Sequence, residues 1–190
     1  MLDEKGTAAA LRAAYKGGGY RVAFAEGKVM IRADTWGAEI EEEYIIPKIL
    51  GTIVEHIGVL PKAPAAYFAQ KKADPGMTCA LDTELSAWVK IHAMANVATT
   101  PIRRTRLLMD GYEIWQTRQG LRACPMDPAY TRIIDEGGVN QAFVRVDGEE
   151  LSKEIYYKGF AETAVIYGVK YKKDDSLARI EGFPWLGEGS

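Results

Sequence analysis

The stretch that most constrains the fold runs from residue 20 to residue 61 and reads YRVAFAEGKVMIRADTWGAEIEEEYIIPKILGTIVEHIGVLP. Apolar and polar side chains alternate on both sides of Glu26-Gly27, and this period of two predicts a β-hairpin over residues 20–33. A weaker alternation over residues 38–42 predicts a third strand. The stretch therefore begins as a sheet with one buried face.

Proline 47 marks a change of structure. Pro47 has no backbone N–H and pushes Ile46 towards extended geometry, so it fits the first position of a new helix. Apolar residues at helical spacing follow it, namely Ile49, Leu50, Ile53, Val54 and Ile57. Gly58 is well placed to end the helix. We expect this helix to pack its apolar face on the hairpin.

The rest of the chain carries further local signals. A helix is expected over residues 3–16, ending at the glycines 17–19, and a strand near residues 67–71. Asp110-Gly111 and Asp147-Gly148 predict two more hairpins. The other expected features are a turn at 72–76, a strand rather than a helix at 83–94, a short helix from Asp127-Pro128, a β-rich run at 160–171 and a last strand at 177–183.

These elements predict an α+β fold, with an antiparallel sheet built from β-hairpins and two or three packed helices. The chain has 190 residues, so a single domain over 1–190 is expected, and two subdomains, 1–72 and 77–190, stay open as the alternative. Its net charge of −2 gives no long-range attraction to nucleic acid or to an anionic membrane. No apolar run is long enough for a membrane span, and the N-terminus lacks the pattern of a signal peptide.

Catalytic and metal-binding signatures are missing from the sequence. There is no CxxC, HxxxH, HExxH, GxGxxG or GxxxxGK[ST] motif, and Gly17–Gly19 follows a helix instead of opening one. His56 is expected at the end of its helix, where a cation meets the negative end of the dipole. Cys79 and Cys124 cannot form a disulfide framework and are expected as reduced, non-catalytic thiols in a cytoplasm, although the sequence does not say whether they lie close together. No catalytic residue, metal or cofactor is predicted.

Arginines are concentrated in one part of the chain. Residues 103–132 carry six Arg, no Lys and three acidic residues, whereas residues 133–190 carry seven basic and eleven acidic residues. Arginine binds phosphate and carboxylate with two parallel hydrogen bonds. The hairpin at Asp110-Gly111 is therefore predicted to present a binding surface made by Arg103, Arg104, Arg106, Arg118 and Trp115. Strand alternation places Arg103 on the face opposite Arg104 and Arg106, and pairing with the acidic C-terminal part is the competing interpretation.

A resemblance rests on the pattern GKVMIRADTWGAEI…IIPKILGTIVEHIGVLP. The residues that carry it are Gly27-Lys28, Ile31-Arg32, Asp34-Thr35-Trp36, Glu39-Ile40 and Pro47 to Gly58. Through them the chain resembles small uncharacterised proteins encoded by phages and prophages of Gram-positive bacteria. The resemblance covers about a quarter of the chain, and implies no activity and no catalytic residues. It implies the class of phage accessory proteins, which includes inhibitors of host defence.

The leading interpretation is a non-catalytic binding protein or inhibitor, acting in a host cytoplasm on a nucleic-acid-handling or nucleotide-signalling system. Its expected partner is a host protein or a nucleotide or nucleic-acid ligand, with no membrane, and self-association stays open. One alternative is a small enzyme that acts on a nucleotide or nucleic acid with acidic residues and a soluble metal ion. The other is an assembly component of a virion.

Overall fold

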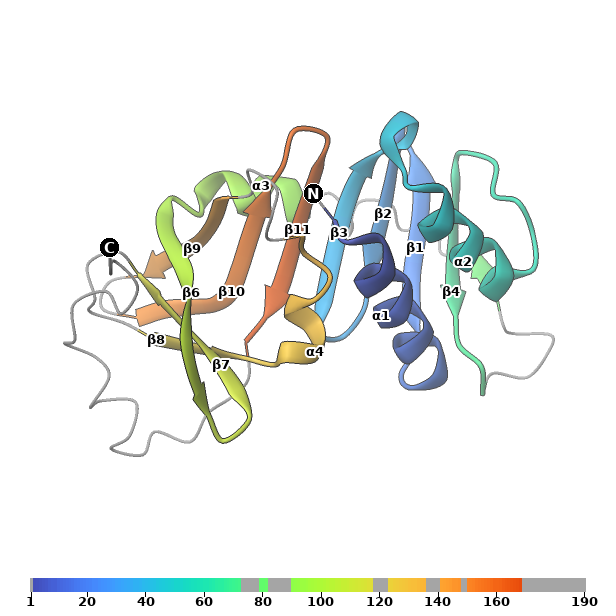
Figure 1. The fold of residues 1–190 in the computed structure, drawn as a ribbon. Helices are drawn as coiled ribbons and strands as arrows, with labels where there is room; N and C mark the ends of the chain where they lie inside the picture. Colours follow the sequence, from blue (N-terminus) through green and yellow to red (C-terminus); the bar gives the residue numbers. More distant parts are fainter. Residues whose placement is uncertain are drawn as a thin grey trace.

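The computed structural model describes residues 2–72, 79–81, 90–117, 123–135, 141–147 and 150–168. Within these residues eleven strands form an antiparallel sheet that is packed with helices, so the predicted α+β class is confirmed (Figure 1). In sheet order the strands are β5 (Cys79–Leu81), β4 (Ala65–Ala69), β1 (Tyr20–Ala25), β2 (Lys28–Arg32), β3 (Trp36–Glu41), β11 (Glu162–Tyr167), β10 (Glu150–Lys158), β9 (Gln141–Asp147), β6 (Thr100–Met109), β7 (Tyr112–Thr117) and β8 (Ala123–Met126).

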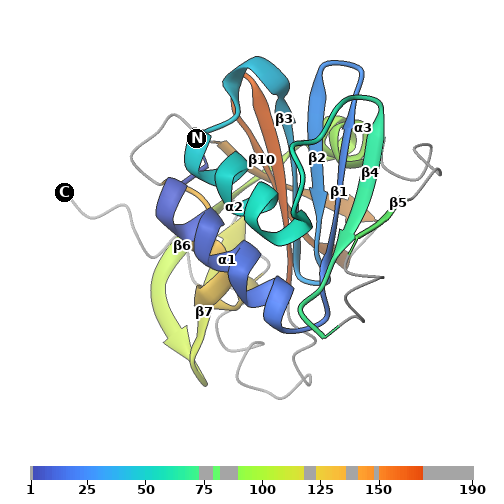
Figure 2. The ribbon, with the colours of Figure 1, turned by 90° about the vertical axis from the view of Figure 1, so that its right-hand side faces the viewer.

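Helices cover both faces of the sheet. Helix α1 (Glu4–Lys16) and helix α2 (Pro47–Ile57) lie on one face, whereas α3 (Lys90–Val97) lies on the other (Figure 2). The one-turn helix α4 (Pro128–Thr131) contacts α1. An isolated β-bridge between Leu2 and Ile134 pairs a residue that precedes α1 with the segment that follows α4. No helix in the described ranges is long and apolar enough to cross a membrane.

The opening hairpin forms as predicted. Val22 pairs with Ile31 across β1 and β2, and the turn residues Glu26 and Gly27 both have positive φ, at 55° and 71°. Two positive φ values give a turn whose twist matches that of the strands. The buried side chains of this hairpin belong to the main core cluster, which also contains Ile53 of α2.

Helix α2 also forms as predicted. It starts at Pro47 and ends before Gly58, which adopts the left-handed conformation at φ 75°. Ile49, Ile53 and Ile57 are buried in the core. The helix contacts α1 and β4 and, through the shared core, closes one face of the sheet.

The expectation of a strand at 83–94 is wrong for residues 90–94, which belong to α3, while residues 82–89 lie outside the described part. Ile91 and Ala95 are spaced by one helical turn, and both are buried against β10 and β11. Gly37 in β3 makes room for this helix, because a Cβ there would lie 2.8 Å from Cδ1 of Ile91. The alternation of apolar residues was compatible with both structures, and packing on the sheet selects the helix.

The other predicted hairpins are present. Asp110 and Gly111, at φ 49° and 83°, join β6 to β7, and β9 pairs with β10 on either side of residues 148–149. The Asp127 side chain caps α4 by accepting from the N–H of Ala129. The expected last strand at 177–183 and most of the turn at 72–76 lie outside the described residues.

Candidate functional site

One row of side chains crosses six strands on the face that carries α3. Residues that lie directly opposite each other in an antiparallel pair share a face of the sheet. Along the row from β4 to β10 these residues are Phe68, Arg21, Arg32, Gly37, Val165 and Tyr156. Helix α3 buries the part of the row on β11 and β10, while Arg21 and Arg32 remain exposed.

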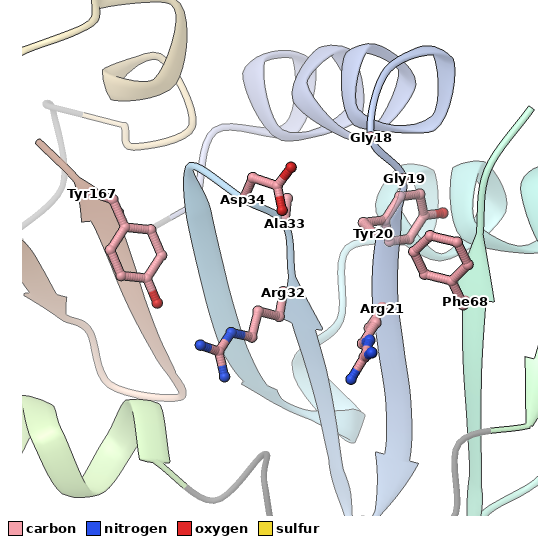
Figure 3. A pocket seen from close by; sticks show the side chains of 9 residues that line it. All are labelled: Gly18, Gly19, Tyr20, Arg21, Arg32, Ala33, Asp34, Phe68 and Tyr167. Carbon is pink, nitrogen blue, oxygen red and sulfur yellow. The ribbon is translucent and has the colours of Figure 1, made fainter. Parts of the chain in front are cut away.

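A pocket of about 590 Å³ lies beside the two arginines, at the end of the sheet where β1 begins and β2 ends. Its wall combines Arg21 and Arg32 with Phe68 of β4, Tyr167 of β11 and Asp34 of the β2–β3 turn (Figure 3). Both guanidinium groups extend in the same direction, away from Asp34, and Phe68 lies next to the backbone of the glycines that precede β1. The pocket thus has a cationic side, an aromatic side and one carboxylate.

Two glycines shape this pocket. Gly19 has a φ of +89°, and a Cβ at this position would lie 2.5 Å from Cζ of Phe68. A Cβ at Gly18 would lie 2.8 Å from Oδ2 of Asp34. Side chains at either position would therefore displace the ring or the carboxylate. The sequence predicted a helix cap here, and Gly17 does cap α1 through its N–H, but the role of Gly18 and Gly19 in the pocket was missed.

The electrostatics of the pocket favour an anion. Arg32 makes no hydrogen bond or ion pair within the part of the chain that the structure describes, and it lies directly opposite Arg21. Like charges that face each other across strands repel. Burial raises the pKa of Tyr167, an effect that the nearby Arg32 opposes, so the hydroxyl stays protonated at neutral pH and can donate a hydrogen bond. A bound oxyanion would relieve the repulsion and accept from all three groups.

The described residues contain no group of three or more His, Cys, Asp or Glu side chains placed to hold a metal ion. The fold and the pocket together define the class: an α+β protein with an arginine-lined pocket at one end of its sheet.

On the β6–β7 hairpin, the residues predicted to form a binding surface are not arranged as the sequence predicted. Arg104 forms an ion pair with Glu113, a carboxylate that is 4% exposed and also accepts from Oγ1 of Thr131 at 2.9 Å. This acidic partner comes from the same hairpin, whereas much of the acidic C-terminal part lies outside the described residues. Leu108 does lie opposite Glu113, as expected for a tight turn. Pairing with a buried acid gives Arg104 a structural role.

The expectation that Trp115 forms part of the binding surface is wrong. It is 5% exposed and contacts Tyr157 edge-to-face at 5.8 Å, so it belongs to the core and offers no surface on which a ligand could stack. Arg103 is exposed. Arg118 and the side chain of Arg106 lie outside the described part of the chain. Ligand binding by these arginines stays a prediction.

His56 lies in the last turn of α2, as expected, but it is not a solvated cation. Its ring is 8% exposed and stacks on Tyr15 at 4.1 Å, and Nδ1 lies 2.9 Å from the hydroxyl of Tyr20. Burial lowers the pKa of His56 more than Glu55 raises it, so the neutral ring is favoured. His56 therefore fastens α2 to α1 and β1 as part of the core.

Cys124 is a free, buried thiol, as predicted. Burial raises its pKa to about 12, which leaves the nucleophilic thiolate unpopulated at neutral pH. Its sulfur lies 3.8 Å from that of Met126. The side chain of Cys79 lies outside the described residues.

No family model matches the chain, and the comparison with curated proteins finds no match. Among solved structures, the fold is similar to a chain assigned as a DNA polymerase III beta subunit from Eubacterium rectale ATCC 33656, with a TM-score of 0.36, 8% identity and coverage of 92% of this chain and 65% of that one. It is also similar to the DNA polymerase III beta subunit from Thermotoga maritima, with a TM-score of 0.36, 10% identity and coverage of 90% and 64%. The chain thus spans less than two thirds of the length of either structure.

Proposed function

We propose that this protein is a non-catalytic binding protein whose pocket takes a nucleotide. The observation that carries the proposal is the cross-strand pair Arg21 and Arg32 in the wall of a pocket that also contains Phe68. Two arginines at opposite positions of neighbouring strands can offer several N–H donors to the oxygens of one phosphate group. The proposed ligand is therefore bound first through its phosphate.

The other lining groups suit the rest of such a ligand. The pocket's volume of about 590 Å³ lies within the range of small-molecule sites, about 300–1,000 Å³. Phe68 offers a face or edge for a flat base, and aromatic contacts with bases tolerate any base. Asp34, away from the guanidinium groups, can accept from ribose hydroxyl groups, while the protonated Tyr167 donates to a phosphate oxygen.

Isothermal titration calorimetry with purified protein tests the ligand class. The probes are a nucleoside monophosphate, a nucleoside diphosphate, the free nucleoside and inorganic phosphate. We expect the nucleotides to bind more tightly than either fragment, and Arg32→Ala to weaken them about tenfold or more, since charged hydrogen bonds are worth about 1.5–3 kcal/mol. Arg132→Ala is the matched control, because Arg132 is exposed and lies outside the pocket lining. Equal affinity in both variants, or no nucleotide binding, would refute the proposal.

Recovery of the bound nucleotide tests the proposal that the protein binds without catalysis. A protein that only binds releases the nucleotide unchanged when the complex is denatured, both with and without added Mg²⁺. Chromatography that finds a hydrolysed or transferred product would instead support the enzyme alternative. Sequestering a nucleotide would suit an inhibitor of a host nucleotide-signalling system. The phage resemblance supports only the broader class of accessory proteins that includes inhibitors of host defence, and the biological role rests on that resemblance.

A further inference from the structure

Two exposed aromatic side chains meet at the end of the sheet opposite the pocket. Phe160, in the β10–β11 turn, is 97% exposed, and Tyr44, in the short 3₁₀ turn Glu42–Tyr44 after β3, is 51% exposed. Their rings meet edge-to-face with centroids 6.1 Å apart. Strand β11 begins at Glu162, beside this pair, and ends at Tyr167 in the pocket wall, so the two surfaces are separated by the length of a strand.

The two loops that carry the aromatic pair are fixed to each other. The N–H of Glu41 donates to the carbonyl of Ala161 at 2.9 Å, and the N–H of Glu42 donates to the carbonyl of Gly27 at 2.7 Å. The N–H of Gly159 donates to the carbonyl of Glu162 at 2.8 Å and closes the turn that presents Phe160. The backbone of both loops is thus held in position before any partner arrives, and preorganisation of this kind lowers the entropic cost of binding.

Acidic side chains surround the pair. The segments 41–44 and 159–162 contain four glutamates and no lysine or arginine. Glu41 lies 4.0 Å from Nζ of Lys28 in the neighbouring strand β2 and is therefore paired. Glu42 and Glu43 are exposed and form no ion pair within the described ranges. The neighbouring Lys158 donates to the carbonyl of Ala98 at 3.0 Å and lies over the ring of Phe143, so its charge is directed to α3 and the sheet. The surface is therefore aromatic at its centre and negative at its rim.

We propose that this surface, made by Tyr44, Phe160 and the glutamates 41–43, docks a basic segment of a partner protein. Lysine and arginine side chains bind aromatic faces through cation–π contacts and pair with carboxylates at the rim. A second copy of this chain is disfavoured as the occupant, because it would bring six glutamates together, three from each copy. An anionic membrane is disfavoured for the same reason.

Fluorescence anisotropy with a labelled peptide of Arg-Gly repeats tests the proposal, and a Glu-Gly peptide of equal length serves as the acidic counterpart. We expect the basic peptide to bind and the acidic peptide not to bind. Phe160→Ser should weaken binding about fivefold or more, the loss of a cation–π contact and its packing. Glu42→Gln combined with Glu43→Gln should weaken it similarly and reduce its salt dependence.

Leu60→Ser is the matched control, since Leu60 is another exposed apolar side chain, at 70%, and lies in the loop after α2. It should leave peptide affinity unchanged, as should Arg32→Ala in β2, at the pocket end of the sheet, so this test stands apart from that of the nucleotide pocket. The proposal would be overturned if both peptides bound equally well or if the Arg-Gly peptide did not bind. It would also be overturned if Phe160→Ser and Leu60→Ser had the same affinity for the peptide. So would sedimentation velocity that shows a dimer lost in Phe160→Ser, since a second copy would then occupy the surface.

Discussion

Replacing Ile53 by Ala should cost about 3–4 kcal/mol of unfolding free energy. Ile53 is fully buried at the centre of the apolar face of α2, within the cluster that joins the helices to β1–β3. The change removes three carbon atoms, and at about 0.8 kcal/mol for each buried methylene the transfer loss is about 2.4 kcal/mol. The cavity adds to this loss, because surrounding atoms fixed by a sheet relax only in part, and the total falls within the usual range of about 2–5 kcal/mol.

Urea unfolding followed by far-UV circular dichroism measures this loss. Val54→Ala is the control: Val54 is the next residue of the same helix but is only half-buried, and alanine is the better helix former, so we expect a loss below about 1 kcal/mol. The two variants thus separate burial from helix propensity. A loss below about 0.5 kcal/mol for Ile53→Ala, or equal losses in both, would show that α2 does not close the core.

Two further predictions concern buried polar groups. Burial lowers the pKa of His56 below its ordinary value of 6.5. As the pH falls, the unfolded chain therefore binds a proton at His56 before the folded chain does. The part of the stability that depends on the neutral ring should be complete above pH 6.5 and should decline as the pH falls below it. Unfolding measured over a series of pH values should show this decline in the native chain and a shallower one in His56→Gln; identical slopes would exclude His56 as its source. Arg104→Ala leaves the buried carboxylate of Glu113 with Thr131 as its remaining partner among the contacts described above, and should cost about 1–3 kcal/mol, part of which Glu113→Gln should restore. If Arg104→Ala instead weakens nucleotide or nucleic-acid binding at unchanged stability, the hairpin is a ligand surface after all.

The sequence predicted the elements whose signals are local. Glu26-Gly27 and Asp110-Gly111 specify tight turns by themselves, because positive φ values at both turn positions are tolerated by few residue types. Pro47 and Gly58 likewise mark the two ends of α2. Helix α3 was not predicted, because the apolar positions between residues 83 and 94 fit two periods. The helix also depends on Gly37, distant in sequence, where a Cβ would lie 2.8 Å from Cδ1 of Ile91.

The pocket was missed because its wall is assembled from four strands, β1, β2, β4 and β11, with the loops beside them. Tyr167 reaches it only because β11 pairs with β3, a contact between strands far apart in the chain. One signal was nevertheless present in the sequence. Arg21 and Arg32 are equally far from the turn Glu26-Gly27, so any hairpin with that two-residue turn places them opposite each other. Two arginines that face each other across strands repel, and a pair of this kind in the sequence points to an anion site more directly than the arginine count of residues 103–132 does.

The distribution of charge also explains why a net charge of −2 is a poor guide to the partners of this protein. At physiological ionic strength charges act over about 8 Å, so a ligand responds to the groups at its own site and not to the total. The pocket end of the sheet exposes the pair Arg21 and Arg32, whereas the far end exposes Glu42 and Glu43. The central strand β11 is hydrogen-bonded on both sides and holds these ends apart. The nucleotide and the basic segment that we propose as ligands would therefore each respond to the charge at its own end of this nearly neutral chain.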